Sequence, residues 1–301
     1  MATSRRTVIS FPRWERATTI WRNAGRLVSH RLFANWGHDH FTMNLITKSQ
    51  ANRIGTLQFN NEGKLNCLSH TLMEELMQGL HDLEKEGVNV IVLRARSGVK
   101  VWSAGHDINE LPEPRRDPLS YGDPLETLLR NIQDCPVPVL AMVEGTVWGG
   151  ACDLCCSCDM VVAAEGSTFA MTPAKIGIPY NASGLMHFVH HIGLNKAKEM
   201  FFTARPTTVH EAWNNGFVNH EVKREELETF TYDLAGKIAQ NAPLAVRAIK
   251  AQFRLLTRGA LIDAETAERI QAIRRQVYDS ADYAEGIKSF KEKRPPVFQG
   301  K

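Results

Sequence analysis

The sequence predicts an α/β fold in which strands and helices alternate and a helical region ends the chain. Short apolar or alternating runs of strand length recur between helix-length amphipathic segments from residue 53 to residue 222. After residue 222, only helical patterns remain. The 43% hydrophobic and 23% charged residues are ordinary for a globular enzyme. No apolar run approaches the roughly 20 residues that a membrane span needs, so we expect no membrane segment.

Residues 1–42 differ in composition from the rest of the chain. They hold seven arginines against Glu15 and Asp39, a surplus of +5, so residues 43–301 carry −2 of the net +3. An Arg-rich, acid-poor leader is typical of an organelle transit peptide. The alternative, which we favour, is a start codon assigned too early, with Met43 as the true first residue. The charge of the body gives no support to nucleic-acid binding.

We expect three parts in the chain: a basic extension over 1–42 outside the fold, a core over 43–235 and a C-terminal helical region over 236–301. In the core, residues 53–60 alternate as a half-buried strand does. Ser69 is the expected N-cap of the helix that follows. The apolar stripe of that helix is Met73, Leu76, Leu80 and Leu83. Gly87 ends the helix, and residues 88–95 form a buried strand.

Two corners of small residues follow, each between an apolar strand and a helical pattern. The first corner is 101–108, after which a short helical pattern, a Pro-rich surface stretch and a helix over 124–132 are expected. The second corner follows the buried strand 136–143 and contains Trp148-Gly149-Gly150-Ala151, directly before a helix. Free N–H groups at such a helix start can point at a ligand oxygen, which glycine lets approach closely. Paired glycines at such a place also serve simple packing.

Downstream of the second corner, residues 159–170 predict a strand pair and residues 171–181 a loop rich in Pro and Gly. Helical segments begin at Ser183, and a short strand over 218–222 interrupts them. Three long helical patterns are then expected to complete the chain.

The chain has six cysteines, four of them crowded into the stretch CDLCCSC. They are Cys67, Cys135, Cys152, Cys155, Cys156 and Cys158. A metal site is one interpretation, but no second Cys-x-x-Cys or His pair stands at a zinc-finger distance. In a helix, Cys152, Cys155 and Cys156 share one face, as small buried hydrophobes do. We therefore prefer core packing, expect no metal, and expect the cytoplasm, where thiols stay free.

With these motifs in view, the chain resembles the crotonase (enoyl-CoA hydratase/isomerase) superfamily over roughly residues 45–299. The carrying stretches are SAGHDI (103–108), VEGTVWGGACDL (143–154), YAEGIKSFKEKRPPVF (283–298), NCLS (66–69) and AWNNGFVNHEV (212–222). The resemblance implies a crotonase-type spiral of ββα repeats with a helical C-terminal region that serves trimerisation or forms a lid. It also implies an acyl-CoA thioester substrate and a homotrimer or a dimer of trimers.

Within that family the chain looks most like the bacterial methylmalonyl-CoA decarboxylases, through AGHDI, DPLSYGDPL, VEGTVWGGA, MTP…GIPYN and YDSADYAEG. The resemblance implies a carbon–carbon lyase that converts methylmalonyl-CoA to propionyl-CoA and CO2. It implies no cofactor, because CoA is part of the substrate. Two backbone amides, which map to His106 and Gly150, would polarise the thioester carbonyl and stabilise the enolate oxygen. A proton-carrying role of the His106 ring is the less favoured interpretation.

The acids that hydratases of this family use are altered in this sequence. The first position, three residues after the oxyanion-hole glycine, is Asp153 instead of glutamate, and the second aligns with Pro173. Addition of water needs a positioned acid/base pair, so hydration is disfavoured. Decarboxylation needs an orienting donor for the substrate carboxylate, and the resemblance assigns that role to Tyr180, with Thr172 contacting the substrate. A packing role for Tyr180 is the alternative. No proton donor to the enolate carbon is identified.

The resemblance also assigns contacts along the substrate and its CoA. Ala104, Gly105, His106, Asp107, Ile108 and Gly150 would line the substrate, and Lys293, Lys64 and Cys67 would contact CoA. A lysine on the surface is more often simply solvated. Two other functions stay open at this stage: an enoyl-CoA hydratase or isomerase on the same fold, and a non-catalytic RNA-binding relative.

Overall fold

The computed structural model describes residues 45–257 and 264–300, so the expected basic extension over 1–42 lies outside the described residues. The strands are β1 (Ile46–Ala51), β2 (Ile54–Phe59), β3 (Val90–Arg94), β4 (Val101–Ser103), β5 (Val139–Val143), β6 (Thr146–Trp148), β7 (Met160–Ala164), β8 (Thr168–Ala170), β9 (Thr207–Thr208) and β10 (His220–Val222). The α-helices are α2 (His70–Lys85), α3 (Pro124–Asp134), α4 (Gly150–Ser157), α5 (Ala182–Thr203), α6 (Val209–Asn214), α7 (Leu227–Gln240), α8 (Pro243–Thr257), α9 (Ala264–Tyr278) and α10 (Ala281–Lys291). The short 3-10 helices are η2 (Glu62–Lys64), η3 (Ile108–Glu110), η4 (Pro173–Ile176) and η5 (Arg224–Glu226).

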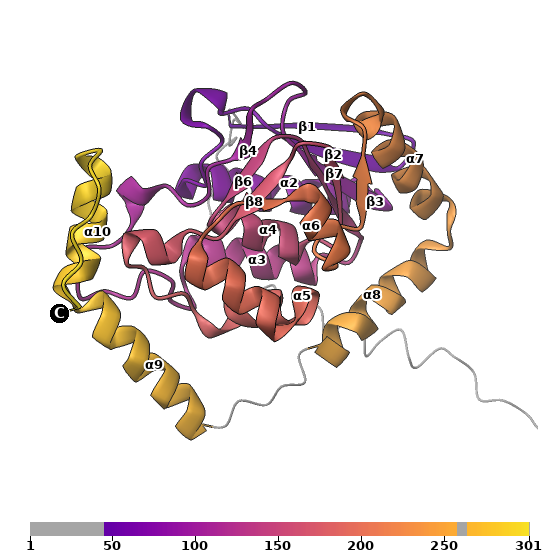
Figure 1. Cartoon of the computed structure of the whole chain (residues 1–301). Helices are drawn as coiled ribbons and strands as arrows, with labels where there is room; N and C mark the ends of the chain where they lie inside the picture. Colours follow the sequence, from indigo (N-terminus) through magenta and orange to yellow (C-terminus); the bar gives the residue numbers. More distant parts are fainter. Residues whose placement is uncertain (1–44, 258–263, 301) are drawn as a thin grey trace, which may run out of the picture. The chain divides into compact units, whose positions relative to one another are not determined.

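The described strands form two sheets, and from β3 to β8 consecutive strands alternate between them. The first sheet has the order β1-β2-β3-β5-β7-β10 and the second the order β4-β6-β8-β9. Strands β3, β5 and β7 are parallel neighbours, as are β4, β6 and β8. A helix follows each pair of strands: α3, α4 and α5 (Figure 1). The chain thus advances by one strand in each sheet per turn, which confirms the expected spiral of ββα units.

Several elements begin at the residues that predicted them. Ser69 caps α2, its side-chain oxygen accepting from the N–H of Leu72 at 3.3 Å. Helix α3 begins with Pro124 after the cap Asp123, whose carboxylate accepts from the N–H of Leu125 at 2.9 Å. The expected apolar stripe of α2 is buried. These local signals agree with the tertiary structure.

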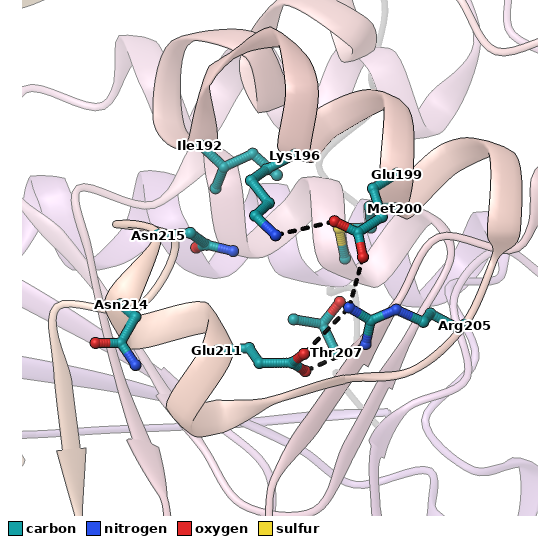
Figure 2. Close-up of a pocket in the computed structure, with 9 residues that line it drawn as sticks. All are labelled: Ile192, Lys196, Glu199, Met200, Arg205, Thr207, Glu211, Asn214 and Asn215. Carbon is teal, nitrogen blue, oxygen red and sulfur yellow. Dashed lines mark hydrogen bonds and ion pairs between the residues drawn. The ribbon is translucent and has the colours of Figure 1, made fainter.

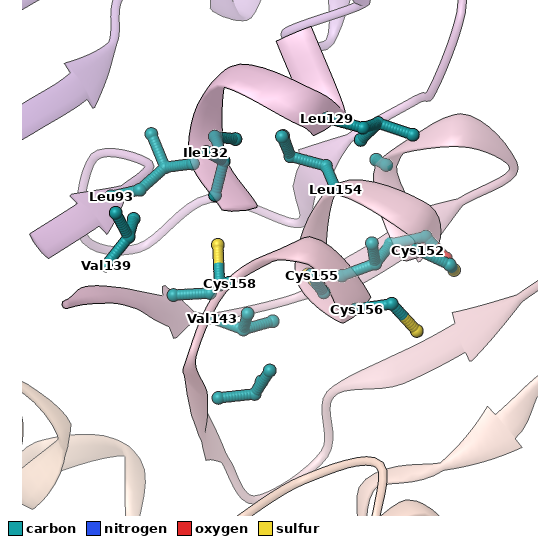
Figure 3. Packing of buried hydrophobic residues seen from close by; sticks show 14 of the residues in the cluster. Leu93, Leu129, Ile132, Val139, Val143, Cys152, Leu154, Cys155, Cys156 and Cys158 are labelled. Carbon is teal, nitrogen blue, oxygen red and sulfur yellow. The ribbon is translucent and has the colours of Figure 1, made fainter. Parts of the chain in front are cut away.

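The cysteine-rich helix α4 packs inside the main apolar core. Cys152 and Cys155 are completely buried, and Cys156 is nearly so (Figure 3). All six cysteines are free. No group of three or more His, Cys, Asp or Glu side chains in the described ranges could hold a metal ion. Burial raises the pKa of the Cys152 and Cys155 thiols far above their ordinary value, so these side chains remain uncharged core residues.

Helix α7 covers the other face of the first sheet. Alternate residues of β3 and β5 point to opposite faces. The residues on the face toward α7 form a separate apolar cluster with Leu227 and Ala235 of that helix. The strand residues of this cluster are Val90 and Val92 of β3, Leu140 and Met142 of β5, and Val162 and Ala164 of β7. The boundary expected at residue 235 lies within α7, and the contacts of that helix are with the core sheet.

The structure contains strands and one helix that the sequence analysis did not expect. Strands β4, β6 and β9 were not expected, because two or three residues are too few to establish a period. Strand β1 was not expected because it is an edge strand with a largely exposed, polar sequence, ITKSQA. The expectation of three C-terminal helices was wrong, since α7, α8, α9 and α10 are all present. The break between α9 and α10 is only a short turn at Asp279 and Ser280, and Ser280 caps α10.

Helices α8 and α10 are held to the core by polar contacts. In α8, Lys250 Nζ contacts Asp159 Oδ2 at 2.7 Å and the carbonyl of Val137 at 3.0 Å. In α10, Tyr283 donates to the carbonyl of Pro112 at 3.1 Å. Gly286 of α10 packs so closely on η4 that a Cβ there would collide with the Ile176 carbonyl. Within the described part of the chain, no helix combines the length and the apolar character needed to cross a membrane.

Candidate active site

The two small-residue corners meet because the strands before them are parallel neighbours. Strand β4 leads into Gly105 and His106, and strand β6 leads into Gly149 and Gly150. Gly105 has φ +81°, and a Cβ on it would lie 3.1 Å from the Gly150 nitrogen and would collide with the Trp148 carbonyl. Only glycine permits this approach. A Cβ built on Gly150 would lie 3.6 Å from the His106 nitrogen, so the two amides are close neighbours.

Within residues 45–257 and 264–300, neither of these two amide N–H groups has a hydrogen-bond acceptor. The backbone groups on either side of His106 pair with Leu68. The Leu68 N–H donates to the Gly105 carbonyl at 2.8 Å, and the Asp107 N–H donates to the Leu68 carbonyl at 3.2 Å. The N–H of His106 therefore faces away from Leu68. Gly150 is the first residue of α4, and its N–H has no partner within the helix. Among the described residues these two donors are available, and the helix adds partial positive charge.

The imidazole of His106 points toward the N-terminus of α3. Its Nδ1 lies 3.1 Å from the Asp107 carbonyl oxygen, and its Nε2 lies 3.9 Å from Asp123 Oδ1. Nε2 is buried and has no hydrogen-bond partner in the described structure. Burial raises the pKa of Asp123, and the positive charge of a protonated His106 would oppose that shift. Among the described residues, Nε2 of this ring is thus a further polar atom without a hydrogen-bond partner, in the same residue as one of the two backbone donors.

The loop that carries Thr172 and Tyr180 crosses the start of α4. Thr172 Oγ1 would lie 3.5 Å from a Cβ on Gly149. The hydroxyl of Tyr180 donates to Asp153 Oδ2 at 2.7 Å. Asp153 lies one helical turn beyond Gly150, so Tyr180 stands within about a turn of the free amide. Pro173, at the second acid position of hydratases, is the buried start of η4.

The environment of Tyr180 keeps its hydroxyl neutral. Burial raises the pKa of Tyr180 far above its ordinary value, and the charge of Asp153 raises it further. The ring packs against Phe201 with centroids 5.2 Å apart. Its single hydroxyl proton is directed to Asp153, so the lone pairs of the oxygen remain for other partners.

Sequence reasoning did not anticipate the polar groups behind Asp153. His187 of α5 has Nδ1 2.6 Å from Asp153 Oδ1. Glu126 of α3 is buried and accepts from Ser183 Oγ at 2.9 Å. Burial, and then the nearby charge of Asp153, raises the pKa of Glu126. The contacts bring α3, α4 and α5 together across the sequence, and no local pattern signals them.

One of the segments expected to contact CoA, residues 64–68, lies beside the first corner. The Ala104 N–H donates to the Leu65 carbonyl at 2.9 Å, and Cys67 Sγ lies 3.7 Å from Asp107 Oδ2, so the segment 64–68 runs beside the first corner. Burial raises the pKa of Cys67 to about 11. Lys64, the first residue of this segment, is exposed. Ile108 begins η3 just after the corner.

Lys293 is the other lysine expected at CoA. It follows α10, is exposed, and its N–H donates to the Phe290 carbonyl at 3.1 Å. None of the contacts described for it reaches the segment 104–108.

A separate cavity of about 210 Å³ lies between α5, β9 and α6 (Figure 2). Its charged groups neutralise one another. Arg205 lies 2.8 Å from Glu199 and 3.1 Å from Glu211, and Lys196 lies 2.9 Å from Glu199. None of the expected site residues lines this cavity, so it is not the candidate active site.

Comparisons with known proteins bear on the site as a whole. The family model described as enoyl-CoA hydratase/isomerase matches residues 49–301. Methylmalonyl-CoA decarboxylase of Escherichia coli (strain K12) is 48% identical over 249 residues, which cover 83% of this chain and 95% of that protein. Enoyl-CoA hydratase domain-containing protein 2 of Homo sapiens, a mitochondrial protein, is 32% identical over 255 residues, covering 82% of this chain and 86% of that protein.

A solved structure gives the same likeness in three dimensions. Methylmalonyl-CoA decarboxylase in complex with 2-nitronate-propionyl-CoA matches with a TM-score of 0.85 at 46% identity. The match covers 86% of this chain and 100% of that chain.

Proposed function

The chain belongs to the enoyl-CoA hydratase/isomerase family, and from that premise we propose that it is a carboxy-lyase that converts methylmalonyl-CoA to propionyl-CoA and CO2. The observation that carries the proposal is the pair of unpartnered backbone amides at His106 and Gly150, which the two parallel strands β4 and β6 bring together. Likeness to methylmalonyl-CoA decarboxylase over most of both chains supports the choice of substrate.

The reaction needs an acceptor for electrons and a way to hold the substrate carboxylate. The bond between the carboxylate carbon and C2 breaks, and its electron pair flows into the thioester carbonyl to give an enolate. CO2 departs, and a proton then adds at C2. The negative charge that develops on the thioester oxygen is stabilised by the amides of His106 and Gly150, which are oriented before the reaction begins. These donors act more strongly on the enolate than on the neutral carbonyl, as catalysis requires.

Hydration of an enoyl-CoA is poorly served by the same site. Both oxygens of Asp153 already have partners, Tyr180 and His187, and the residue is completely buried. Pro173 offers no acid at the second position. Activation of water and protonation of carbon need two positioned groups, so decarboxylation is the reaction that these residues favour.

We further propose that the reaction uses no metal or organic cofactor, because the substrate's own thioester carbonyl accepts the electron pair. We place the enzyme in the cytoplasm, where its free thiols would stay reduced. Lys64 and Lys293 are the proposed partners of the CoA phosphates.

Purified protein is expected to release CO2 from methylmalonyl-CoA and to form propionyl-CoA in equal amount. The measurement is trapped CO2 together with chromatography of the CoA esters. Crotonyl-CoA is the control substrate, and its hydration should be slower by orders of magnitude. Comparable hydration, or no CO2, would overturn the proposed function in favour of a hydratase.

Tyr180→Phe is expected to slow CO2 release roughly 10- to 100-fold, because it leaves Asp153 with an unsatisfied buried oxygen and removes the polar group beside the pocket. Binding of propionyl-CoA should remain largely intact, because the ring still packs against Phe201. The matched control is Tyr121→Phe, since the Tyr121 side chain is 80% exposed. A wild-type rate in Tyr180→Phe would remove Tyr180 from the mechanism.

We propose that the enzyme is a homotrimer or a dimer of trimers, formed through an apolar face of α8. Ile249, Phe253 and Leu256 lie one helical turn apart on this face and are 53%, 64% and 76% exposed. Such a row of large apolar side chains is typical of an interface. Lys250, on a neighbouring side of the helix, anchors it to the core.

A double substitution, Phe253→Glu with Leu256→Glu, is expected to convert the assembly to a monomer, because buried carboxylates would lack partners in the interface. Light scattering coupled to size exclusion measures the mass. Gln252→Glu, one residue away on the same helix, should leave the assembly unchanged. A double variant of wild-type mass would show that this face is not the interface.

A further inference from the structure

Asp153 is a buried carboxylate that lies close to where an anionic substrate would react. It is completely buried, and each of its oxygens has one partner: Tyr180 donates to Oδ2 at 2.7 Å, and His187 Nδ1 lies 2.6 Å from Oδ1. It occupies the first turn of α4, whose first N–H is one of the two free donors. A net negative charge at this place would repel both the substrate carboxylate and the enolate oxygen.

The far side of the His187 ring is also built to accept either charge state. Its Nε2 lies 2.9 Å from Nε2 of Gln133, which also donates to Ser157 Oγ at 3.2 Å. In this orientation the amide N–H donates to a neutral ring, and rotation of the amide by half a turn places its oxygen there instead. A carboxamide can offer its N–H₂ to a neutral imidazole or, after rotation, its oxygen to an imidazolium. Gln133 therefore satisfies the ring in both protonation states.

The other charged groups around His187 come from each element packed against it. Glu126 of α3 is negative when ionised, and Arg254 of α8 is positive but paired with Asp134 at 3.0 Å. On α5 itself, His190 is exposed, and burial lowers the pKa of His191. Among the described residues, His187 is therefore the basic side chain in direct contact with Asp153.

We propose that His187 is a positioning residue whose imidazolium neutralises Asp153 and holds it on Tyr180, so that the neighbouring pocket can receive a substrate carboxylate. This inference rests on the proposed decarboxylase function. It assigns His187 no contact with the reacting atoms. His187 affects the reaction only by setting the charge and the orientation of Asp153.

The sign of the pH dependence follows from the environment of His187. Burial lowers the pKa of His187, but the charge and the hydrogen bond of Asp153 outweigh burial, and Glu126 adds to them, so its pKa is raised overall. The proton is therefore retained to a higher pH than in an ordinary histidine, whose pKa is about 6.5, and is lost as the pH rises further. The substrate carboxylate is ionised throughout this interval. Activity toward the anionic substrate should therefore persist to a higher pH than a histidine of ordinary pKa would allow, and fall as the pH rises past the raised pKa of His187.

His187→Asn tests the proposal, because an asparagine amide can donate to Asp153 from a position near that of Nδ1 but carries no charge. For methylmalonyl-CoA, kcat/KM at pH 7 is expected to fall about 10- to 100-fold, and the alkaline fall of the wild-type profile should disappear. Inhibition by propionyl-CoA, whose acyl group is neutral, should change less than about threefold. His190→Asn is the matched control on the same helix and should keep the wild-type rate and profile.

Two outcomes of the kinetics would overturn the inference. One is a His187→Asn enzyme with the wild-type rate and the wild-type alkaline fall. The other is a loss of propionyl-CoA affinity as large as the loss of kcat/KM. That result would show that the substitution changes the shape of the pocket and not its charge.

An NMR titration of the histidines gives a readout that needs no turnover. The His187 pKa should lie above the ordinary value in the wild type and drop in Asp153→Asn. A wild-type His187 that titrates at or below the ordinary value would refute the proposed charge state. If the protein releases no CO2, the proposed function fails, while the titration still decides whether the Asp153–His187 ion pair exists.

Discussion

Gly150→Ala is expected to lower kcat for decarboxylation about 100- to 1,000-fold, the range found when one donor of an oxyanion hole is lost. The added Cβ would lie 3.6 Å from the His106 nitrogen, beside the second donor, and 2.7 Å from Leu125 Cδ2. A thioester oxygen could not then approach both amides. Leu125 can move its methyl group, so the fold should survive. Steady-state kinetics with methylmalonyl-CoA and thermal unfolding together measure the two effects.

The control for this variant is Gly236→Ala in α7, where an added Cβ would meet nothing within 4 Å. That variant should retain wild-type kinetics. A Gly150→Ala enzyme that keeps wild-type kcat with an unchanged Tm would mean that the enolate oxygen binds elsewhere.

Arg274→Met is expected to cost about 3–5 kcal/mol of unfolding free energy, as is typical when a buried ion pair loses one partner. The guanidinium of Arg274 forms a bidentate pair with Asp117, at 2.8 and 2.5 Å. It also donates to the carbonyls of Leu119 and Pro179, at 3.1 and 3.4 Å. Because Pro179 precedes Tyr180, loss of these bonds should also loosen the catalytic loop and lower kcat. Denaturant unfolding measures the stability, and methionine preserves most of the alkyl packing.

The matched control is Arg275→Met, the next residue of α9, whose side chain is exposed. It should unfold at the wild-type denaturant concentration. If Arg274→Met is as stable as this control, the pair with Asp117 does not hold α9 to the two loops.

The two corners were predictable from the sequence because their signals are local. Small residues after apolar strands predicted the two corners, and the resemblance to the crotonase superfamily assigned the backbone donors to His106 and Gly150. Parallel strands end at the same edge of a sheet, so two such corners meet once β4 and β6 pair. The strands themselves were missed because each has three residues.

The groups behind the corners were not predictable in the same way. His187 and Asp153 are 34 residues apart, and α5 shows no periodic signal that marks His187 among its neighbouring histidines. Tyr180 was expected as a neutral donor to the substrate. Its neutrality follows from burial beside Asp153, but the direction of its proton depends on a contact between two elements. Arg274 is likewise a buried charge in a helix whose sequence is largely polar, and its partner lies 157 residues away.

The most direct test of the central claim is a crystal structure of this protein with 2-nitronate-propionyl-CoA, an analogue that cannot lose CO2. The account predicts that the thioester oxygen lies within about 2.7–3.1 Å of both the His106 and the Gly150 nitrogens. A thioester oxygen bound to neither amide, or to only one of them, would contradict it.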